Sequence, residues 1–130
     1  TPYWCRENDE LGADGSITFG TRVPLVGLPF SWTLDDFPQM EFVLGRGLTI
    51  EGLNDPRKCE SMWLADMDFM AEEVEDGVYV MCFHPQVIGR GARIRVVERM
   101  IRRAREHGFT FSTCLEAAQN WKARNPFQAA

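Results

Sequence analysis

The chain has 130 residues, of which 45% are apolar and 25% charged, and its 14 basic and 19 acidic residues give a net charge of −5. This length is typical of one domain with its own hydrophobic core. The acidic balance argues against nucleic acid as the main partner, because nucleic-acid-binding domains normally carry a clustered basic face. The one basic run, Arg90 to Arg105, alternates with apolar residues at helical spacing and is typical of a solvated helix face.

Membrane and disulfide signals are weak throughout the chain. No apolar run approaches the roughly 18 residues that a membrane span needs, and the first residues lack the layout of a secretion signal. The cysteines are widely scattered and form no C-x-x-C pair. We therefore predict reduced thiols, no disulfide framework, no cysteine zinc site, no membrane span and a cytoplasmic location. The four cysteines are Cys5, Cys59, Cys82 and Cys114.

The first part of the chain is predicted to contain little regular structure. Residues 1–22 are polar and glycine-rich and are predicted to be a loop. Residues 25–30 form a short apolar run that predicts a strand, and residues 37–53 are interrupted by glycines and predicted to be irregular. Asp55 and Pro56 form a helix-start signal, and the apolar spacing predicts a helix to about Glu73. Its methionines and Trp63 are predicted core residues, as is Trp121.

The second part alternates between predicted strands and helices. Residues 78–83 are apolar and predict a buried strand, and Phe109 to Phe111 predicts a short one. Gly108 is a natural stop for the helix between them. Thr113 and Glu116 form a capping box that opens a last helix through Trp121. The apolar face predicted for the middle helix is Ile94, Val97, Met100, Ile101 and Ala104.

This alternation predicts an α/β fold, in which a parallel sheet with helices outside it forms an open layer or part of a barrel. Three short parallel strands would expose unpaired edges, and a long N-terminal loop needs a surface to lie against. The chain is therefore predicted to be part of a larger fold. Its start at Thr1 fits a cut boundary, and removal of an initiator methionine would give the same start. Exposed edges also predict self-association, as a homo-oligomer, or partner binding.

His84 is the first candidate for a functional residue. It follows the predicted strand of residues 78–83 and precedes a loop and a helix. The carboxyl end of a barrel strand is where catalytic groups lie in α/β barrels. The alternative is a structural histidine that caps the strand end.

A second unusual segment holds Trp32, Asp35 and Asp36. The two carboxylates are candidates for positioning His84, and the indole is a candidate for a pocket wall. The alternatives are that the aspartates cap the turn before Pro38 and that Trp32 belongs to the core.

The runs Pro24 to Pro38 and Phe83 to Arg90 together resemble the polysaccharide deacetylase family. The similarity extends over nearly the whole chain and is greatest to the intracellular branch of allantoinase-like and cyclic-imide-hydrolase-like enzymes. The two motifs are specific jointly, and neither is specific alone.

The resemblance implies a distorted (β/α) barrel hydrolase with one divalent metal ion, zinc or similar. In that family the metal-binding Asp and two His, and the aspartate general base, come from the N-terminal half, whereas residues 1–130 correspond to the C-terminal half. His84 and His107 cannot supply this set, and His107 lies at a helix end where capping is the favoured role. A zinc site needs three protein ligands and an open position. We therefore predict that this chain alone binds no metal, and that a missing N-terminal half or a partner chain supplies the ligands.

The resemblance also implies roles for single residues. His84 matches the general acid that protonates the departing nitrogen, with Asp35 or Asp36 holding the imidazole and Trp32 shaping the pocket. Tyr3 matches a loop motif near the oxyanion. Arg90 is predicted to hold the loop, with contact to a polar substrate group as the alternative. Gly27 replaces an acidic residue and Gly91 a frequent proline of the family, and these departures bear on substrate specificity.

Three functions remain open from the sequence. The favoured one is the C-terminal part of a metal-dependent hydrolase that cleaves a non-peptide C–N bond. The second is one chain of a two-chain enzyme, and the third is a non-catalytic binding or assembly module. Candidate substrates are N-acetyl sugars, cyclic ureides, cyclic imides and other small amides, all of which present a polarised carbonyl on nitrogen.

Overall fold

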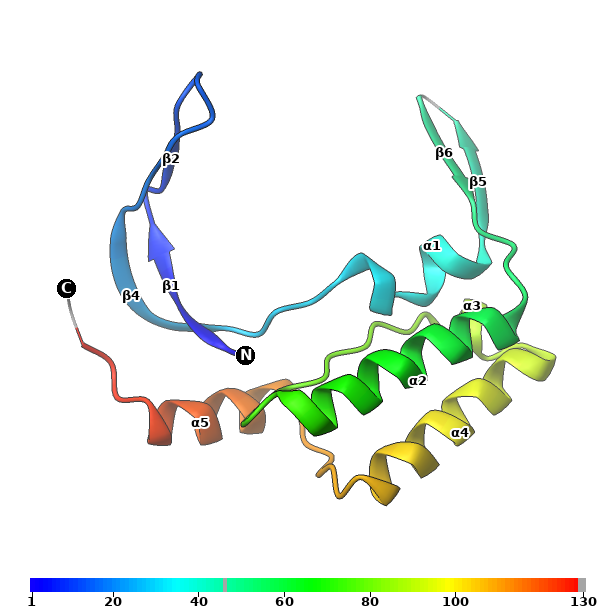
Figure 1. Ribbon diagram of the computed structural model, residues 1–130. Helices are drawn as coiled ribbons and strands as arrows, with labels where there is room; N and C mark the ends of the chain where they lie inside the picture. The colour runs from blue at the N-terminus through cyan, green and yellow to red at the C-terminus, as the bar shows by residue number, and fades with distance from the viewer. Residues whose placement is uncertain (46, 129–130) are drawn as a thin grey trace. The chain divides into compact units, whose positions relative to one another are not determined.

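The computed structural model describes residues 1–45 and 47–128 (Figure 1). The chain divides into two compact units. Unit 1 is Thr1–Pro29 together with the C-terminal segment from Ser112, and unit 2 is Phe30–Phe111. In the part of the chain that the structure describes, no helix has the length and apolar character needed to cross a bilayer.

Unit 1 is built from antiparallel strands and one helix. Strand β1 (Tyr3–Glu7) pairs with β4 (Thr21–Gly27), and β2 (Glu10–Leu11) pairs with β3 (Ile17–Thr18) in a short hairpin between them. Helix α5 (Cys114–Arg124) begins at the Thr113–Glu116 capping box, as predicted. Its Trp121 is 8% exposed and makes an edge contact with the Trp4 ring, at 5.3 Å between centroids.

The prediction of a loop over residues 1–22 is wrong, and the strand predicted at residues 25–30 lies earlier, ending at Gly27. Strand β1 is half-buried and β4 is mostly exposed, and neither shows apolar alternation, so local periodicity does not reveal them. Their pairing depends instead on backbone turns at Asn8 and Gly15, which have φ values of 61° and 83°.

Unit 2 is mainly helical. The 3₁₀ turn η1 (Trp32–Leu34) leads into α1 (Asp36–Met40), and a hairpin of β5 (Phe42–Gly45) and β6 (Leu48–Glu51) follows. Helix α2 (Pro56–Glu73) begins at Asp55 and Pro56 and ends where predicted. Helices α3 (Pro85–Ile88) and α4 (Gly91–Glu106) complete the unit. The region predicted to be irregular, residues 37–53, therefore contains a helix and a hairpin.

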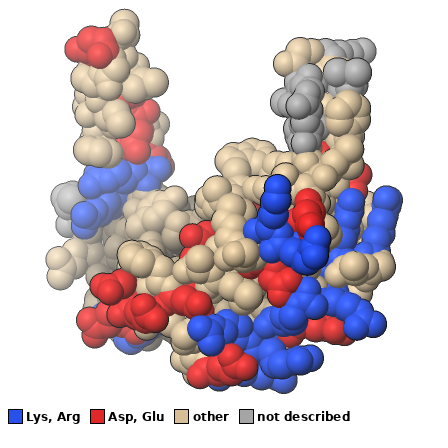
Figure 2. All heavy atoms as spheres, turned by 45° about the vertical axis from the view of Figure 1, so that its right-hand side comes forward, with Lys and Arg blue, Asp and Glu red and all other residues tan. Residues whose placement is uncertain are grey.

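Helices α2 and α4 lie side by side and enclose the core of unit 2 (Figure 1). Arg99 pairs with Glu60 and Arg103 with Asp68 along the outer edge of this interface, where basic and acidic side chains are interspersed (Figure 2). The basic run of α4 is thus a solvated, ion-paired helix face, as its spacing predicted. The buried apolar residues are Met40, Cys59, Trp63, Met67, Val87, Ile88, Val96, Met100 and Ala104.

The predicted parallel sheet is not formed among the described residues, whose sheets are three antiparallel pairs. Residues 78–83 are half-buried and make one parallel bridge, between Asp35 and Cys82. The strand predicted at Phe109 to Phe111 is also absent, because the N–H of Phe109 bonds the carbonyl of Ala104 and closes α4 after Gly108, whose φ is 76°. A parallel strand needs a partner strand that is joined to it by a crossover connection, and an apolar run alone does not provide one. The mixed helix–strand content is compatible with the α/β class.

Candidate functional site

His84 lies where the extended segment of residues 78–83 meets α3. It occupies the N-cap position of α3, with Pro85 as the first helical residue. The segment is held by two backbone hydrogen bonds, from the N–H of Cys82 to the carbonyl of Leu34 and from the N–H of Asp36 to the carbonyl of Cys82. These bonds place the start of α1 beside the start of α3, and the side chains of Asp36 and His84 meet there.

Asp36 is bonded to His84 in two ways. Its Oδ1 lies 2.7 Å from Nδ1 of the imidazole, and both carboxylate oxygens accept from the backbone N–H of His84, at 3.1 and 3.0 Å. A carboxylate only accepts hydrogen bonds, so Nδ1 carries a proton and Nε2 is left for another partner. The Asp36 side chain is fully buried, whereas that of His84 is 34% exposed. The imidazole is therefore hydrogen-bonded to a buried carboxylate at Nδ1, and the rest of the ring is accessible to solvent.

The Asp36 contact also changes the acidity of the imidazole. The hydrogen bond to Asp36 raises the pKa of His84 above its ordinary value of 6.5, the charges of Asp36 and Asp35 act in the same direction, and desolvation opposes them. The Phe37 ring lies 5.3 Å from the imidazole, between ring centroids. The protonated form of His84 is therefore present at higher pH than in a free histidine.

Asp35 has a mainly structural position. Its Oδ1 accepts the N–H of Phe37 at 2.8 Å and so caps α1, and it lies 3.6 Å from Nδ1 of His84. The sequence does not decide which of the two aspartates contacts the imidazole. In the structure Asp36 forms the hydrogen bond with the ring, and Asp35 caps the helix.

The ligand atoms of Asp35, Cys82 and His84 lie within 4.8 Å of one another, which raises the question of a metal. Burial raises the pKa of the Cys82 thiol, and the charges of Asp35 and Asp36 raise it further, so the thiolate that a metal requires is disfavoured. Nδ1 of His84 is bonded to Asp36, and Asp35 caps a helix. As arranged, this set does not offer the three free donors of a catalytic metal site, because the Cys82 thiol is held protonated, Oδ1 of Asp35 and Nδ1 of His84 are already bonded, and Nε2 of His84 alone is open.

The remaining predicted site residues are Trp32 and Arg90 in unit 2 and Tyr3 in unit 1. Trp32 is 73% exposed and contacts Phe30, at 6.4 Å between ring centroids, so it is not a core residue. Arg90 is exposed at the N-cap of α4 and makes no side-chain cap bond there.

Two residues that organise the site were not predicted. Cys82 precedes His84 by two positions. Residues two apart in an extended segment lie on the same side, so the sequence could have predicted that Cys82 lies beside His84. Arg93 of α4 bonds Glu41 and the carbonyls of Met40 and Val87, at 2.9 to 3.2 Å, and so joins α1, α3 and α4. Nothing local in the sequence distinguishes Arg93 from the other arginines of its helix.

Taken with its neighbours, His84 is an accessible imidazole backed by a buried carboxylate, an arrangement suited to proton transfer. No family model matches the chain. The chain is 31% identical to a peptidoglycan deacetylase of Helicobacter pylori (strain ATCC 700392 / 26695), over an alignment of 137 positions that covers 97% of this chain. It spans 46% of the length of that relative. This similarity supports the resemblance to polysaccharide deacetylases, whereas the allantoinase-like branch stays a prediction.

Proposed function

We propose that this chain is the C-terminal part of a hydrolase that cleaves the C–N bond of an N-acetylated amino sugar, with His84 as the general acid. The observation that carries the proposal is the 2.7 Å contact between Nδ1 of His84 and the fully buried carboxylate of Asp36. The similarity to a peptidoglycan deacetylase over 97% of the chain supports the same reaction class. It favours an N-acetyl sugar polymer over the ureide and imide substrates of the allantoinase-like branch.

The proposed role of His84 is to deliver a proton to the departing nitrogen. An amide nitrogen leaves only when it is protonated, and an imidazole suits this transfer near neutral pH. Nδ1–H stays bonded to Asp36, so the proton leaves from Nε2, the exposed side of the ring. Asp36 stabilises the imidazolium before transfer and keeps the ring in one orientation. Asp35 and Phe37 act as positioning residues, because they fix the start of α1 and pack against the ring.

We further propose that the divalent metal of a complete enzyme is bound outside this chain. The Asp35, Cys82 and His84 donors do not fit it, and the chain spans less than half of its relative. A partial (β/α) barrel and a second polypeptide segment that completes it are parts of the same proposal. The cytoplasmic location stays a prediction from the sequence and is not part of it, because peptidoglycan lies outside the cytoplasm. Self-association as a homo-oligomer stays a prediction.

The test is release of acetate from chitotetraose and from peptidoglycan glycan strands. It is measured for the chain alone and together with a polypeptide that supplies the rest of such a deacetylase. We expect release only in the combined sample, and loss of release in His84→Ala but not in His107→Ala. Release that survives His84→Ala would contradict the proposal, as would turnover of allantoin or succinimide in place of acetate release.

A further inference from the structure

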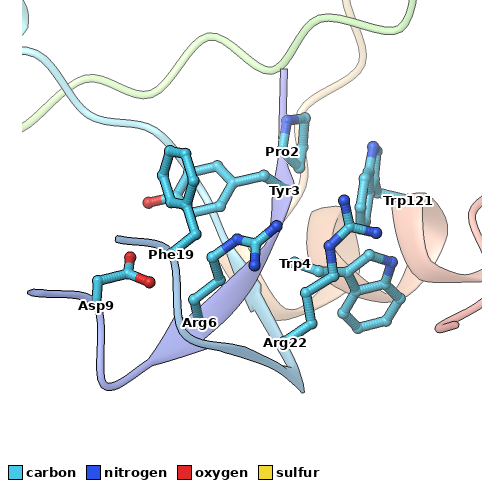
Figure 3. A pocket seen from close by; sticks show the side chains of 8 residues that line it. All are labelled: Pro2, Tyr3, Trp4, Arg6, Asp9, Phe19, Arg22 and Trp121. Atoms are coloured by element: carbon cyan, nitrogen blue, oxygen red, sulfur yellow. The ribbon is translucent and has the colours of Figure 1, made fainter. Parts of the chain in front are cut away.

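Unit 1 contains a cleft of about 490 Å³ that the proposed acid–base chemistry does not use. Aromatic rings and guanidinium groups dominate its lining. In Figure 3 the Arg6 side chain lies toward the rings of Tyr3 and Phe19, and the Arg22 side chain lies toward those of Trp4 and Trp121. The lining residues are Pro2, Tyr3, Trp4, Arg6, Asp9, Phe19, Arg22 and Trp121.

The positions of the two arginines are electrostatically unfavourable when no anion is bound nearby. Arg6 and Arg22 are direct partners in the β1–β4 ladder, so their side chains leave the same face of the sheet. Like charges at such a position destabilise a strand pair. Arg6 donates to the carbonyl of Gly20 at 2.7 Å and lies over the Phe19 ring. Arg22 is exposed, and its side chain has no ion pair or hydrogen bond within residues 1–45 and 47–128.

The cleft offers little negative charge to offset these two cations. Among the described residues that line it, Asp9 is the one acid, and its Oδ1 accepts the backbone N–H of Gly20 at 2.7 Å. An anion beside Arg22 would relieve the repulsion between the guanidinium groups. A planar guanidinium binds a carboxylate through two parallel hydrogen bonds, which makes a carboxylate the favoured anion.

The aromatic side chains supply flat apolar surfaces around the cations. Trp4 is held by edge contacts with Trp121 and Phe127, at 5.3 and 5.1 Å between ring centroids. Tyr3 is 54% exposed, and its ring crosses Gly27 so closely that a Cβ there would lie 2.6 Å from the Cζ atom of Tyr3. The glycine at position 27 therefore lets the Tyr3 ring lie flat beside the cleft. Such rings bind the apolar face of a sugar.

We propose that this cleft binds a glycan unit that carries a carboxylate, with Arg22 bonded to the carboxylate and the aromatic rings against the sugar. The choice of a sugar rests on the proposed deacetylase function, whereas the anionic requirement stands on the arginine pair alone. N-acetylmuramic acid, the carboxylated sugar of peptidoglycan, has this chemistry. The cleft would then select acidic glycan strands over neutral ones.

The experiment compares two disaccharides of equal length by tryptophan fluorescence, since Trp4 and Trp121 line the cleft. One is N-acetylglucosamine linked to N-acetylmuramic acid, and the other is di-N-acetylchitobiose. We expect the acidic disaccharide to bind at least about tenfold more tightly, which one charge-assisted hydrogen bond would supply. Arg22→Gln should remove this preference, and Phe19→Ala should weaken binding of both sugars.

Two controls separate this inference from the proposed function. Arg102→Gln removes one exposed charge from α4 and should leave the preference intact. His84→Ala should reduce acetate release by at least about 100-fold but keep binding of the acidic disaccharide. Equal affinity for the two sugars, or a preference that survives Arg22→Gln, would overturn the inference whatever the result for His84.

Discussion

Two histidine–aspartate pairs occur in unit 2, and they have the same contact distance in different surroundings. His84 contacts Asp36 and His107 contacts Asp68, each at 2.7 Å. The Asp36 side chain is fully buried, and within the described residues its hydrogen bonds are to the ring and the backbone N–H of His84. Asp68 is 33% exposed and also binds Arg103 through both oxygens. The charge of Asp68 is therefore shared with a guanidinium, whereas His84 is the one cationic partner of Asp36 among the described residues. A short contact does not make a proton-transfer pair unless the carboxylate lacks a competing cation.

The largest expected effect that separates the two pairs is on turnover. His84→Ala should reduce acetate release by roughly 10²- to 10⁴-fold, the usual contribution of a general acid. His107→Ala should leave the rate unchanged, because the ring of His107 is bonded to Asp68 of α2 and not to the pair of His84 and Asp36. The measurement is acetate release at saturating substrate in the combined sample. A comparable loss in both variants would show that the effect is structural.

A smaller effect is expected on the titration of the imidazoles. The bond to Asp36 raises the pKa of His84, so Asp36→Asn should move it back toward 6.5. Because the folded-state pKa is raised, the stability that His84 contributes is fully present below pH 6.5 and is lost as pH rises through the folded value. NMR titration resolves both rings, since the chain has two histidines, and His107→Ala assigns them. An unchanged His84 titration in Asp36→Asn would contradict the assigned cause.

The second pair is expected to respond in the acid range. Hydrogen bonds from Arg103 and His107 lower the pKa of Asp68 from 3.8 to about 2. A lowered folded-state pKa contributes stability above pH 3.8 that is lost as pH falls through about 2. Asp68→Asn should therefore lower the thermal midpoint at pH 6 and flatten its dependence on pH below 4. Thermal unfolding followed by circular dichroism checks this, and an unchanged midpoint would show that the ion pair contributes nothing.

The smallest expected effect concerns Cys82, which lies near the first pair. Burial and the charges of Asp35 and Asp36 raise the pKa of this thiol, so it should react more slowly with iodoacetamide near pH 8 than the exposed Cys114. Asp35→Asn should accelerate labelling of Cys82 severalfold and leave Cys114 unaffected. Mass spectrometry of labelled peptides gives both rates. Faster labelling of Cys82 than of Cys114 would be inconsistent with the described environment.

The helices of this chain could be predicted better than its strands. The caps at Asp55–Pro56 and at Thr113–Glu116 are local signals, and α2 and α5 begin there. The strands of unit 1 depend on pairing between distant residues with no apolar alternation, so the sequence predicts a loop there. The buried face of α4 was only partly predicted, because Ile94 and Ile101 are exposed and Val96 is buried. The bonds of Arg93 to α1 and α3 set the rotation of that helix, and they are tertiary contacts.

The candidate site was likewise predictable only in part. Sequence motifs indicated both segments that meet in the structure, the one with Asp35 and Asp36 and the one that ends at His84. The choice between the two aspartates depends on the bonds of Cys82 to Leu34 and Asp36, which set how the segments align. Trp32 was predicted to shape the pocket or to lie in the core, and its 73% exposure contradicts the core alternative. Its role in substrate binding stays a prediction.

The pH dependence of acetate release by the combined sample tests the central claim most directly, in wild type, Asp36→Asn and Asp68→Asn. If His84 is the acid and Asp36 raises its pKa, the alkaline fall in rate should move to lower pH in Asp36→Asn. The matched Asp68→Asn variant should retain the wild-type profile. An alkaline fall that stays in place in Asp36→Asn, or moves equally in both variants, would contradict the assignment of His84 and Asp36 as the proton-donating pair.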